Sequence, residues 1–367
     1  MTNLFCLNCR ARITSLHLDE RCQSCRFQVS FLRSLFKTDR SFDELVNEAA
    51  CTVSSQLSEH QVGKCNAVLV VRSFQRLECP TIDFLNGLGL PFFLLLAATD
   101  PMGEEYVTKH AHRIKLNQIL VGVKGAEENV RWAEAVLRKA LRLENKATAN
   151  LFVLDDNITS LKIKICDGKG KRSGIDMTKA NFLRFLETAF AEARRHKLSI
   201  FSGARSPNPL DGKAALADKS HLHQSHERGK LFTPAFDAHV YGGAFGLIVS
   251  AVEALDLQVT PGRPSIVGDL ERGCRSYLKE GKCMYFPSVA IGKKKMSGGS
   301  GRMEMTDDAQ VEAMLGVFRD CLGSVDDELA KRYLDLMWHK KWAQTAVEQY
   351  MEERKFVRRP KKRRLPE

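Results

Sequence analysis

One stretch of the chain, residues 119–158, constrains the fold more than any other. It contains an apolar strand over 119–123, a glycine turn, an amphipathic helix over 127–143 and a second apolar strand over 151–154. Apolar residues in the helical part recur at the spacing that places them on one face. A strand, a helix and a strand in this order predict a β-α-β unit, whose two strands lie parallel in one sheet.

Three polar residues, Asp155, Asp156 and Asn157, come directly after the second of these strands. In open α/β sheets, ligands bind outside the carboxyl ends of the strands. Adjacent carboxylates repel each other unless positive charge lies between them, and a divalent cation that carries a diphosphate supplies such charge. We therefore expect Asp155, Asp156 and Asn157 to lie near a divalent cation, Mn2+ or Mg2+. A helix cap or a turn uses the same residue types, but no helical pattern follows here.

The same alternation occurs upstream. Residues 67–71 and 92–97 are apolar runs typical of buried parallel strands, and a helix is expected between them over 80–88. Right-handed crossovers would make these strands one sheet with helices on both faces. The chain contains neither G-x-G-x-x-G nor G-x4-G-K-S/T, which argues against an ordinary dinucleotide or P-loop site.

Size and hydropathy indicate a soluble, intracellular protein. The 367 residues suffice for one large or two medium domains. No apolar run reaches the roughly 18–20 residues that cross a bilayer, so no membrane partner is expected. The N-terminus lacks the basic-then-apolar pattern of a signal peptide.

The net charge of +12 is partly concentrated near the C-terminus, where residues 354–364 hold eight Lys or Arg and no acid. Such a run stays extended because like charges repel. The simplest interpretation is a solubilising tail. The alternatives are a nuclear-import signal, a nucleic-acid-binding arm, or a segment that serves as both.

Four cysteines near the N-terminus have the spacing of a zinc site. Cys6, Cys9, Cys22 and Cys25 form C-x2-C-x12-C-x2-C, so two thiolate pairs can close a tetrahedral shell around Zn2+. A closed four-cysteine site leaves no position for substrate, and we expect a structural zinc knuckle over residues 1–30. Disulfide pairing or chance spacing is the alternative. The other cysteines are scattered and are expected to serve as small apolar residues.

The segment 68–157 resembles the donor half of the GT-A glycosyltransferases. In that family a strand ending in Arg-Ser begins the nucleotide-sugar site, a VGxKG…N…R segment precedes the metal-binding strand, and an acidic DxD element ends it. The form LFVLDDNI is most similar to the branch of base-J-associated glucosyltransferases and of the glycosyltransferase domain of the vertebrate oestrogen-regulated breast-cancer growth protein. The matching residues are Arg72-Ser73, Val121-Gly122-Val123-Lys124-Gly125, Asn129, Arg131 and Asp155-Asp156-Asn157.

The resemblance implies an α/β fold of the GT-A-like nucleotide-diphospho-sugar transferase type, with a Rossmann-like mixed sheet. It implies metal-assisted transfer of a hexose from a UDP-sugar, with UDP-glucose the first choice. Contacts to this donor are expected from Arg72, Ser73, Lys124, Asn129, Arg131 and Asp155. For Lys124, Asn129 and Arg131, a solvated helix face is at least as good an interpretation.

Within the resemblance, the second half of the domain binds the acceptor. Tyr241-Gly242-Gly243 would bring the backbone close to it, since glycine permits close approach, although such a turn is often only a turn. A helix over 247–255 would pack behind this turn. Asp269, and second Glu271, would take the proton of the acceptor hydroxyl; a capping role at a helix start is the alternative.

Basic residues lie beside the glycine-rich segment 296–301. Lys293 and Lys295 suit a leaving diphosphate, which they would attract by charge, but an exposed surface loop has the same composition.

The expected organisation is a zinc knuckle at the N-terminus followed by a helical connector, the transferase domain, C-terminal helices and a basic tail. The ranges are 1–30, 31–64, 65–305 (donor half 65–160, acceptor half 161–305), 306–353 and 354–367.

The branch that the sequence resembles is linked with enzymes that hydroxylate DNA pyrimidines. A hydroxymethylated pyrimidine in DNA is therefore the expected acceptor and the nucleus the expected location, or the cytoplasm of a phage host or bacterium. A nuclear protein O-glycosyltransferase is the first alternative. The second is an inactive GT-A fold that binds DNA or chromatin as a scaffold, because Asn157 stands where many members have a second Asp.

Overall fold

The computed structural model describes residues 4–5, 12–13, 41–110, 113–114, 118–122, 126–166, 172–203, 217–218, 231–255, 260, 267–294 and 306–356. Some of the expected features lie outside these ranges: the four cysteines of the zinc knuckle, Lys124, Lys295 and the basic tail from residue 357. Near the N-terminus, β1 (Leu4–Phe5) and β2 (Arg12–Ile13) pair antiparallel.

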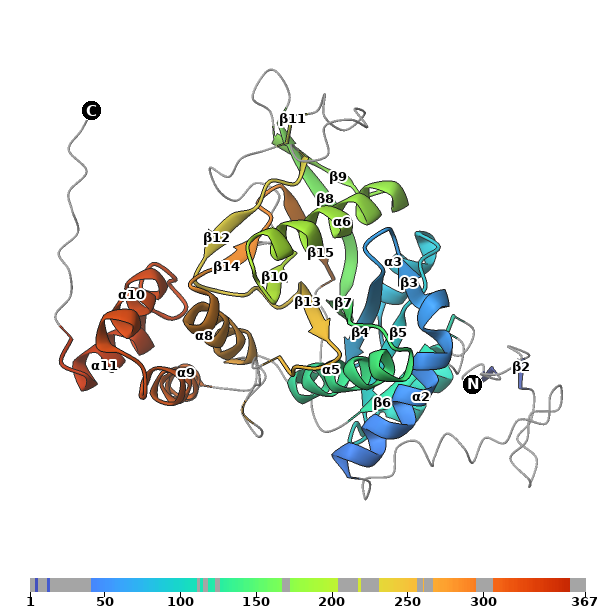
Figure 1. Cartoon of the computed structure of the whole chain (residues 1–367), viewed down its shortest axis with the longest axis horizontal. Helices are drawn as coiled ribbons and strands as arrows, with labels where there is room; N and C mark the ends of the chain where they lie inside the picture. The colour runs from blue at the N-terminus through green and yellow to red at the C-terminus, as the bar shows by residue number, and fades with distance from the viewer. Residues whose placement is uncertain are drawn as a thin grey trace.

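A mixed sheet of nine strands lies at the centre of the described structure (Figure 1). Its order is β12-β14-β10-β13-β7-β4-β5-β6, with β3 also paired to β4. The strands are β3 (Gln61–Val62), β4 (Ala67–Ser73), β5 (Phe93–Ala97), β6 (Ile119–Gly122), β7 (Thr148–Asp155), β10 (Ile200–Ser202), β12 (Ala235–Asp237), β13 (Ala244–Ser250) and β14 (Cys283–Tyr285). The fold is therefore α/β and Rossmann-like, as predicted at that level.

The chain reverses its direction of travel across the sheet between β4 and β7. From β4 the chain adds β5 and then β6 on one side, and it returns to place β7 on the other side of β4. All four strands are parallel. A reversal of this kind is the topological switch point at which open α/β sheets bind ligands.

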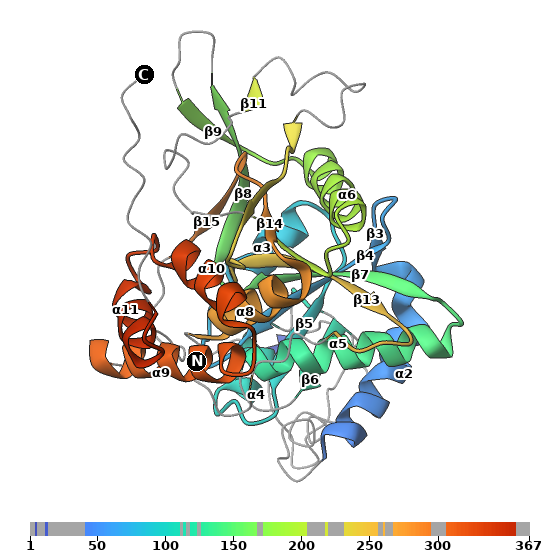
Figure 2. The same cartoon turned by 60° about the vertical axis from the view of Figure 1, so that its left-hand side comes forward.

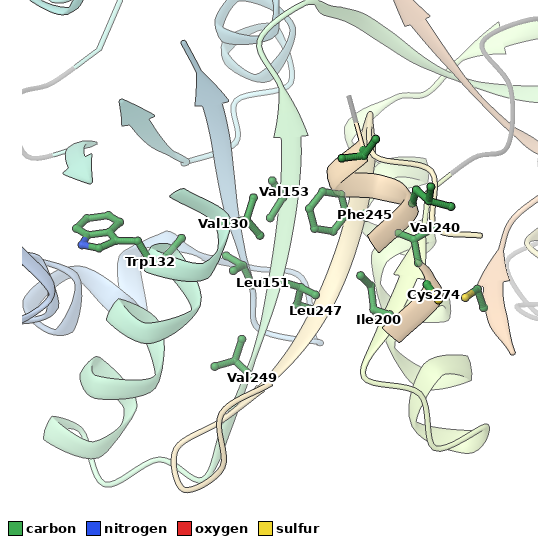
Figure 3. Close-up of a cluster of buried hydrophobic side chains, with 14 of the residues drawn as sticks. Val130, Trp132, Leu151, Val153, Ile200, Val240, Phe245, Leu247, Val249 and Cys274 are labelled. Carbon is green, nitrogen blue, oxygen red and sulfur yellow. The ribbon is translucent and has the colours of Figure 1, made fainter. Parts of the chain in front are cut away.

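Helices cover both faces of the sheet because the residues of its strands alternate between two cores. Val68 and Val70 of β4 join the core beneath α2 (Phe42–His60) and α5 (Ala126–Leu143). Leu69 and Val71 join the core beneath α3 (Pro80–Gly87) and α6 (Lys179–Arg195). Figure 3 shows the first core, where Val130 of α5 lies beside Val153 and Leu151 of β7, whereas Trp132 points away from β7. The short helix α4 (Gly103–His110) follows β5.

A smaller sheet extends from the carboxyl end of β7. It contains β8 (Ile158–Cys166), β9 (Arg172–Asp176), β11 (Ala217–Asp218) and β15 (Val289–Lys293). β8 starts directly after Asn157 and pairs antiparallel with β15, so Lys293 lies opposite Ile158. This pairing brings the end of β15 back to the acidic residues of β7.

The prediction of a helix over residues 247–255 is wrong. Residues 244–250 form β13, which pairs antiparallel with residues 148–154 of β7. The run Leu247-Ile248-Val249 is apolar and partly β-branched, which suits a strand between two others. Its partner strand lies about a hundred residues earlier in the sequence, so local spacing could not reveal the pairing.

The expected C-terminal helices are present. α9 (Asp307–Leu322), α10 (Asp327–Met337) and α11 (Gln344–Glu353) lie beside α8 (Gly268–Glu280) in both Figure 1 and Figure 2. Phe318, Tyr333 and Tyr350 join the same core as β13, so these helices form part of the domain's interior. None of the helices in the described ranges is long and apolar enough to span a bilayer.

Candidate functional site

Two polar pairs stand where β4 and β7 end, at the switch point. Arg72 and Asp155 are register partners, and Arg72 Nε donates to Asp155 Oδ1 at 2.9 Å. One residue further along, Ser73 Oγ donates to Asp156 Oδ2 at 2.7 Å. Because successive side chains of a strand alternate between the faces of a sheet, the two pairs point to opposite sides. The carboxylates are adjacent in sequence but face different surroundings.

Asp155 is held between two cations. Besides the bond from Arg72, Lys293 Nζ donates to Asp155 Oδ2 at 2.7 Å. Burial disfavours ionisation of this carboxyl, but the charges and hydrogen bonds of Arg72 and Lys293 outweigh burial and lower its pKa. Asp155 is therefore ionised at neutral pH and keeps both cations in place.

Asp156 is buried on the other side, with 2% of its surface exposed. Arg76 Nη1 donates to its Oδ1 at 2.6 Å, and Ser73 to its Oδ2. Burial is the larger effect here and raises the pKa of Asp156, although Arg76 and Ser73 act in the opposite direction. No pattern in the sequence predicted the contact from Arg76.

Thr81, at the start of α3, fixes the turn that carries these carboxylates. Its Oγ1 donates to the carbonyl oxygen of Asp155 at 2.6 Å and accepts from the backbone N–H of Ile158 at 2.9 Å. The Thr81 side chain therefore holds both ends of the turn. No pattern in the sequence links residue 81 to residue 155, so this anchor was also missed.

The Tyr241-Gly242-Gly243 turn closes over the end of β4. Arg72 Nη2 donates to the Gly242 carbonyl oxygen at 2.9 Å, and Asp155 N–H donates to the Gly243 carbonyl oxygen at 3.0 Å. A Cβ on Gly242 would overlap the Asp269 carboxylate. A Cβ on Gly243 would lie 2.7 Å from Nζ of Lys293. The two glycines thus make room for charged side chains of the protein itself.

The two candidate acids of α8 face different ways. Asp269 lies against Gly242 and accepts from Arg272 Nη1 at 3.1 Å. Glu271 is fully buried; it accepts from the backbone and hydroxyl of Thr260 and from Arg275. Residues two apart on a helix point in nearly opposite directions, because one turn takes 3.6 residues. Asp269 therefore belongs to the site, and Glu271 fixes α8 to the segment at Thr260.

Two buried arginines flank one aromatic ring beneath this turn. The guanidinium carbon of Arg272 lies 4.6 Å from the centre of the Phe245 ring, and that of Arg72 lies 5.6 Å from it. Arginine interacts favourably with an aromatic face at such distances. Phe245 of β13 therefore helps to hold both the partner of Asp155 and the partner of Asp269.

A second polar group joins the C-terminal helices to Tyr241. Lys340, between α10 and α11, donates to Asp237 and to the Tyr241 hydroxyl, which in turn donates to Asp237 at 3.0 Å. Lys340 contributes to lowering the pKa of Asp237 despite the opposing effect of burial. The neighbouring His239 ring packs against Trp342, and burial and then Lys340 lower its pKa to about 3.

Two of the donor residues expected from the resemblance lie away from Asp155. Asn129 is buried beneath Gly122 at the end of β6, where a Cβ on this glycine would overlap its amide. Arg131 stacks on Phe42 of α2 at 5.5 Å. Since neighbouring strands are about 4.8 Å apart, β6 ends roughly 14 Å from Asp155. The structure does not bring these side chains to the carboxylates.

The side chains expected near a divalent cation do not form a shared site in this arrangement. Both oxygens of Asp155 bind Arg72 and Lys293, and those of Asp156 bind Ser73 and Arg76 on the opposite side. The Asn157 Oδ1 atom is buried and has no hydrogen-bond partner within the described part of the chain. These same ranges contain no group of three or more His, Cys, Asp or Glu side chains that could hold a metal ion. The donor set therefore does not fit Mn2+ or Mg2+ as it stands.

No protein-family profile matches the chain. A search of curated proteins gives no significant match either.

Proposed function

We propose that this chain is a glycosyltransferase that moves a hexose, glucose as first choice, from a UDP-sugar to a hydroxymethylated pyrimidine in DNA. One observation carries the proposal: Arg72, Asp155, Lys293 and Asp269 converge at the switch point of the sheet. They come from two strands of the main sheet, from β15 and from α8. Cations suit a diphosphate and a carboxylate suits a proton, which are the two demands of sugar transfer.

Each residue has a role in the proposed step. Lys293 and Arg72 face the diphosphate and stabilise the negative charge that develops on it. Asp269 accepts the proton of the acceptor hydroxyl, whose oxygen forms a bond to the anomeric carbon. The bond from that carbon to the β-phosphate oxygen breaks, and its electron pair leaves with UDP. The resemblance implies inversion at the anomeric carbon. No step is assigned to a metal, since the donor set does not fit one.

Charge supports the choice of acceptor. The net charge of +12 and the basic run after residue 353 favour a polyanion such as DNA, which binds Lys and Arg through its phosphates. A base inside a duplex would have to leave the stack to reach Asp269. The location proposed on the same grounds is the nucleus.

A scaffold without activity is the second candidate, and one observation favours it. Both carboxylates already have cationic partners within the protein, which an inactive fold would need for its stability. An inactive fold would bind DNA and release no UDP from any donor.

The test is incubation of the full chain with UDP-sugars and DNA that contains hydroxymethyluracil or hydroxymethylcytosine. Mass spectrometry of the digested nucleosides should show a hexose adduct. Asp155→Ala should abolish the adduct and leave DNA binding intact. An adduct on a protein hydroxyl instead would identify the alternative acceptor, and no UDP release with any donor would support the scaffold.

A further inference from the structure

A lysine lies against Asp155, where a divalent cation was expected. Lys293 Nζ lies 2.7 Å from Asp155 Oδ2, on the side of the carboxylate away from the bond that Arg72 makes to Oδ1. Arg72 is 8% exposed, whereas the Lys293 side chain is 33% exposed. The lysine is therefore the cation that a molecule arriving from solvent would meet first.

The surrounding backbone is shaped to hold this lysine. The pairing of β15 with β8 shifts register between Gly292 and Lys293. Such irregularities change the direction of the side chains that follow them and occur often beside functional sites. The lysine then crosses Gly243, where a Cβ would lie 2.7 Å from both Cε and Nζ. A larger residue at 243 would push the lysine off Asp155.

The second carboxylate cannot complete a metal site without a rearrangement. Asp156 faces the opposite side of the sheet, is almost fully buried and is bonded to Ser73 and Arg76. Mg2+ in phosphate sites is bound through one or two carboxylates together with the phosphates. Here the more accessible carboxylate, Asp155, is already paired with Lys293 and Arg72, and Asp156 points to the opposite side.

We propose that the Lys293 ammonium takes the place of a divalent cation at Asp155, so that this site binds a nucleoside diphosphate without a metal ion; this rests on the proposed function. Asp155 accepts a hydrogen bond from Lys293 and so orients its ammonium group. An ammonium group carries more donors than its bond to Asp155 uses, so it can donate to a phosphate oxygen at the same time. Lys293 keeps its proton when the bond to the sugar breaks and the electron pair leaves with UDP.

The first experiment measures UDP binding to the full chain by calorimetry, once with EDTA and once with Mn2+. Wild type should bind equally in both. Lys293→Ala should bind about tenfold or more weakly in EDTA, because a charge-assisted hydrogen bond to phosphate is lost. Lys294→Ala is the matched control: it removes the same charge one residue away, from a lysine that pairs with Glu78 and not with Asp155.

The second experiment uses Mn2+ alone and follows its binding by electron paramagnetic resonance. Wild type and Asp155→Asn should give the same titration, because Lys293 excludes the ion from Asp155. The proposal is overturned if wild type binds a Mn2+ ion that Asp155→Asn loses, if UDP binding by wild type requires Mn2+, or if Lys293→Ala binds UDP in EDTA as wild type does. If UDP never binds, the proposed function fails, and the Mn2+ titration still decides the place of Lys293.

Discussion

At the scale of single residues, the candidate site depends on side chains that hold one another. Asp269 has a buried partner in Arg272, and Asp155 has Arg72 and Lys293. All three of Asp155, Lys293 and Asp269 were candidates from the sequence: Asp155 because it follows an apolar run, Lys293 because it lies beside a glycine-rich segment, and Asp269 because of the resemblance. Arg272 of α8 and Lys340 of the connection between α10 and α11 were not predicted, because a charged residue in a polar stretch of sequence gives no sign that it will be buried.

One substitution at Asp269 and one at Glu271 can show which of the two carboxylates acts as the proposed proton acceptor. Asp269→Asn keeps an oxygen for Arg272 and removes the proton acceptor, so the rate of transfer should fall about 100-fold to 10,000-fold. The affinity for UDP should stay unchanged. Kinetics with a UDP-sugar and hydroxymethylated DNA measure both quantities. Glu271→Gln should lower the melting temperature and leave the rate nearly intact; the opposite pattern would assign the base to Glu271.

His239 should make the fold sensitive to acid. Its pKa falls from 6.5 to about 3 in the folded chain, so it stays neutral there, while the unfolded chain takes up a proton below 6.5. Between pH 6.5 and about 3 the unfolded state therefore binds more protons than the folded state. As the pH falls through this range, the free energy of unfolding decreases by about 1.4 kcal/mol per pH unit.

Urea denaturation of wild type and His239→Phe, at neutral pH and at about pH 5, tests this contribution. The phenylalanine keeps a ring against Trp342, and the pH slope should become shallower. His110, whose pKa burial lowers to about 4, should maintain part of the slope. The exposed His339 offers a control, as His339→Gln should follow wild type. Equal slopes for wild type and His239→Phe would refute the assignment.

At the scale of helices and strands, the sequence predicted the parallel half of the sheet well. The strands at β4, β5, β6 and β7 and the helix at α5 could be predicted because their signals are local: apolar runs and helical spacing. The second half of β13, residues 247–250, was assigned to a helix over 247–255, since a short apolar run fits both periods and the deciding partner, β7, is distant in sequence. The same limit applies to Lys293 and Asp155, which lie 138 residues apart.

Packing of β13 gives a prediction at this scale. A Cβ on Gly246 would overlap the buried ring of Phe201, so Gly246→Ala should destabilise the fold by about 1–3 kcal/mol through overpacking. Gly87→Ala is the control, because a Cβ there meets no atom within 4 Å. Chemical denaturation of both variants measures the difference. Equal free energies of unfolding for Gly246→Ala and Gly87→Ala would mean that β13 and β10 can move apart without loss of stability.

At the scale of the whole molecule, the C-terminal helices belong to the domain rather than to an appendage. Their residues share a core with β13 and α8, and Lys340 reaches Tyr241 next to the Gly242-Gly243 turn. The basic run beyond them is different, since no apolar residue pattern ties it to that core. The two parts should therefore behave differently when they are removed.

Deletion of residues 357–367 should leave the fold intact and weaken DNA binding, because the lost Lys and Arg no longer displace counterions from phosphate. The dependence of affinity on salt should become shallower. Fluorescence anisotropy with a labelled duplex over a salt series measures both. A longer deletion from residue 306 should abolish cooperative unfolding altogether. An unchanged salt dependence after the short deletion would place the DNA contacts elsewhere.

The Gly242-Gly243 turn has a consequence for how such a site can change. Asp269 lies against the first glycine and Lys293 against the second, so one peptide unit fixes the spacing between the proposed proton acceptor and the proposed phosphate contact. An insertion in this turn would separate the two functions in a single step. A substitution elsewhere in α8 would affect only Asp269, and one in β15 would affect only Lys293. The distance between the carboxylate and the ammonium group therefore depends on the Gly242-Gly243 turn.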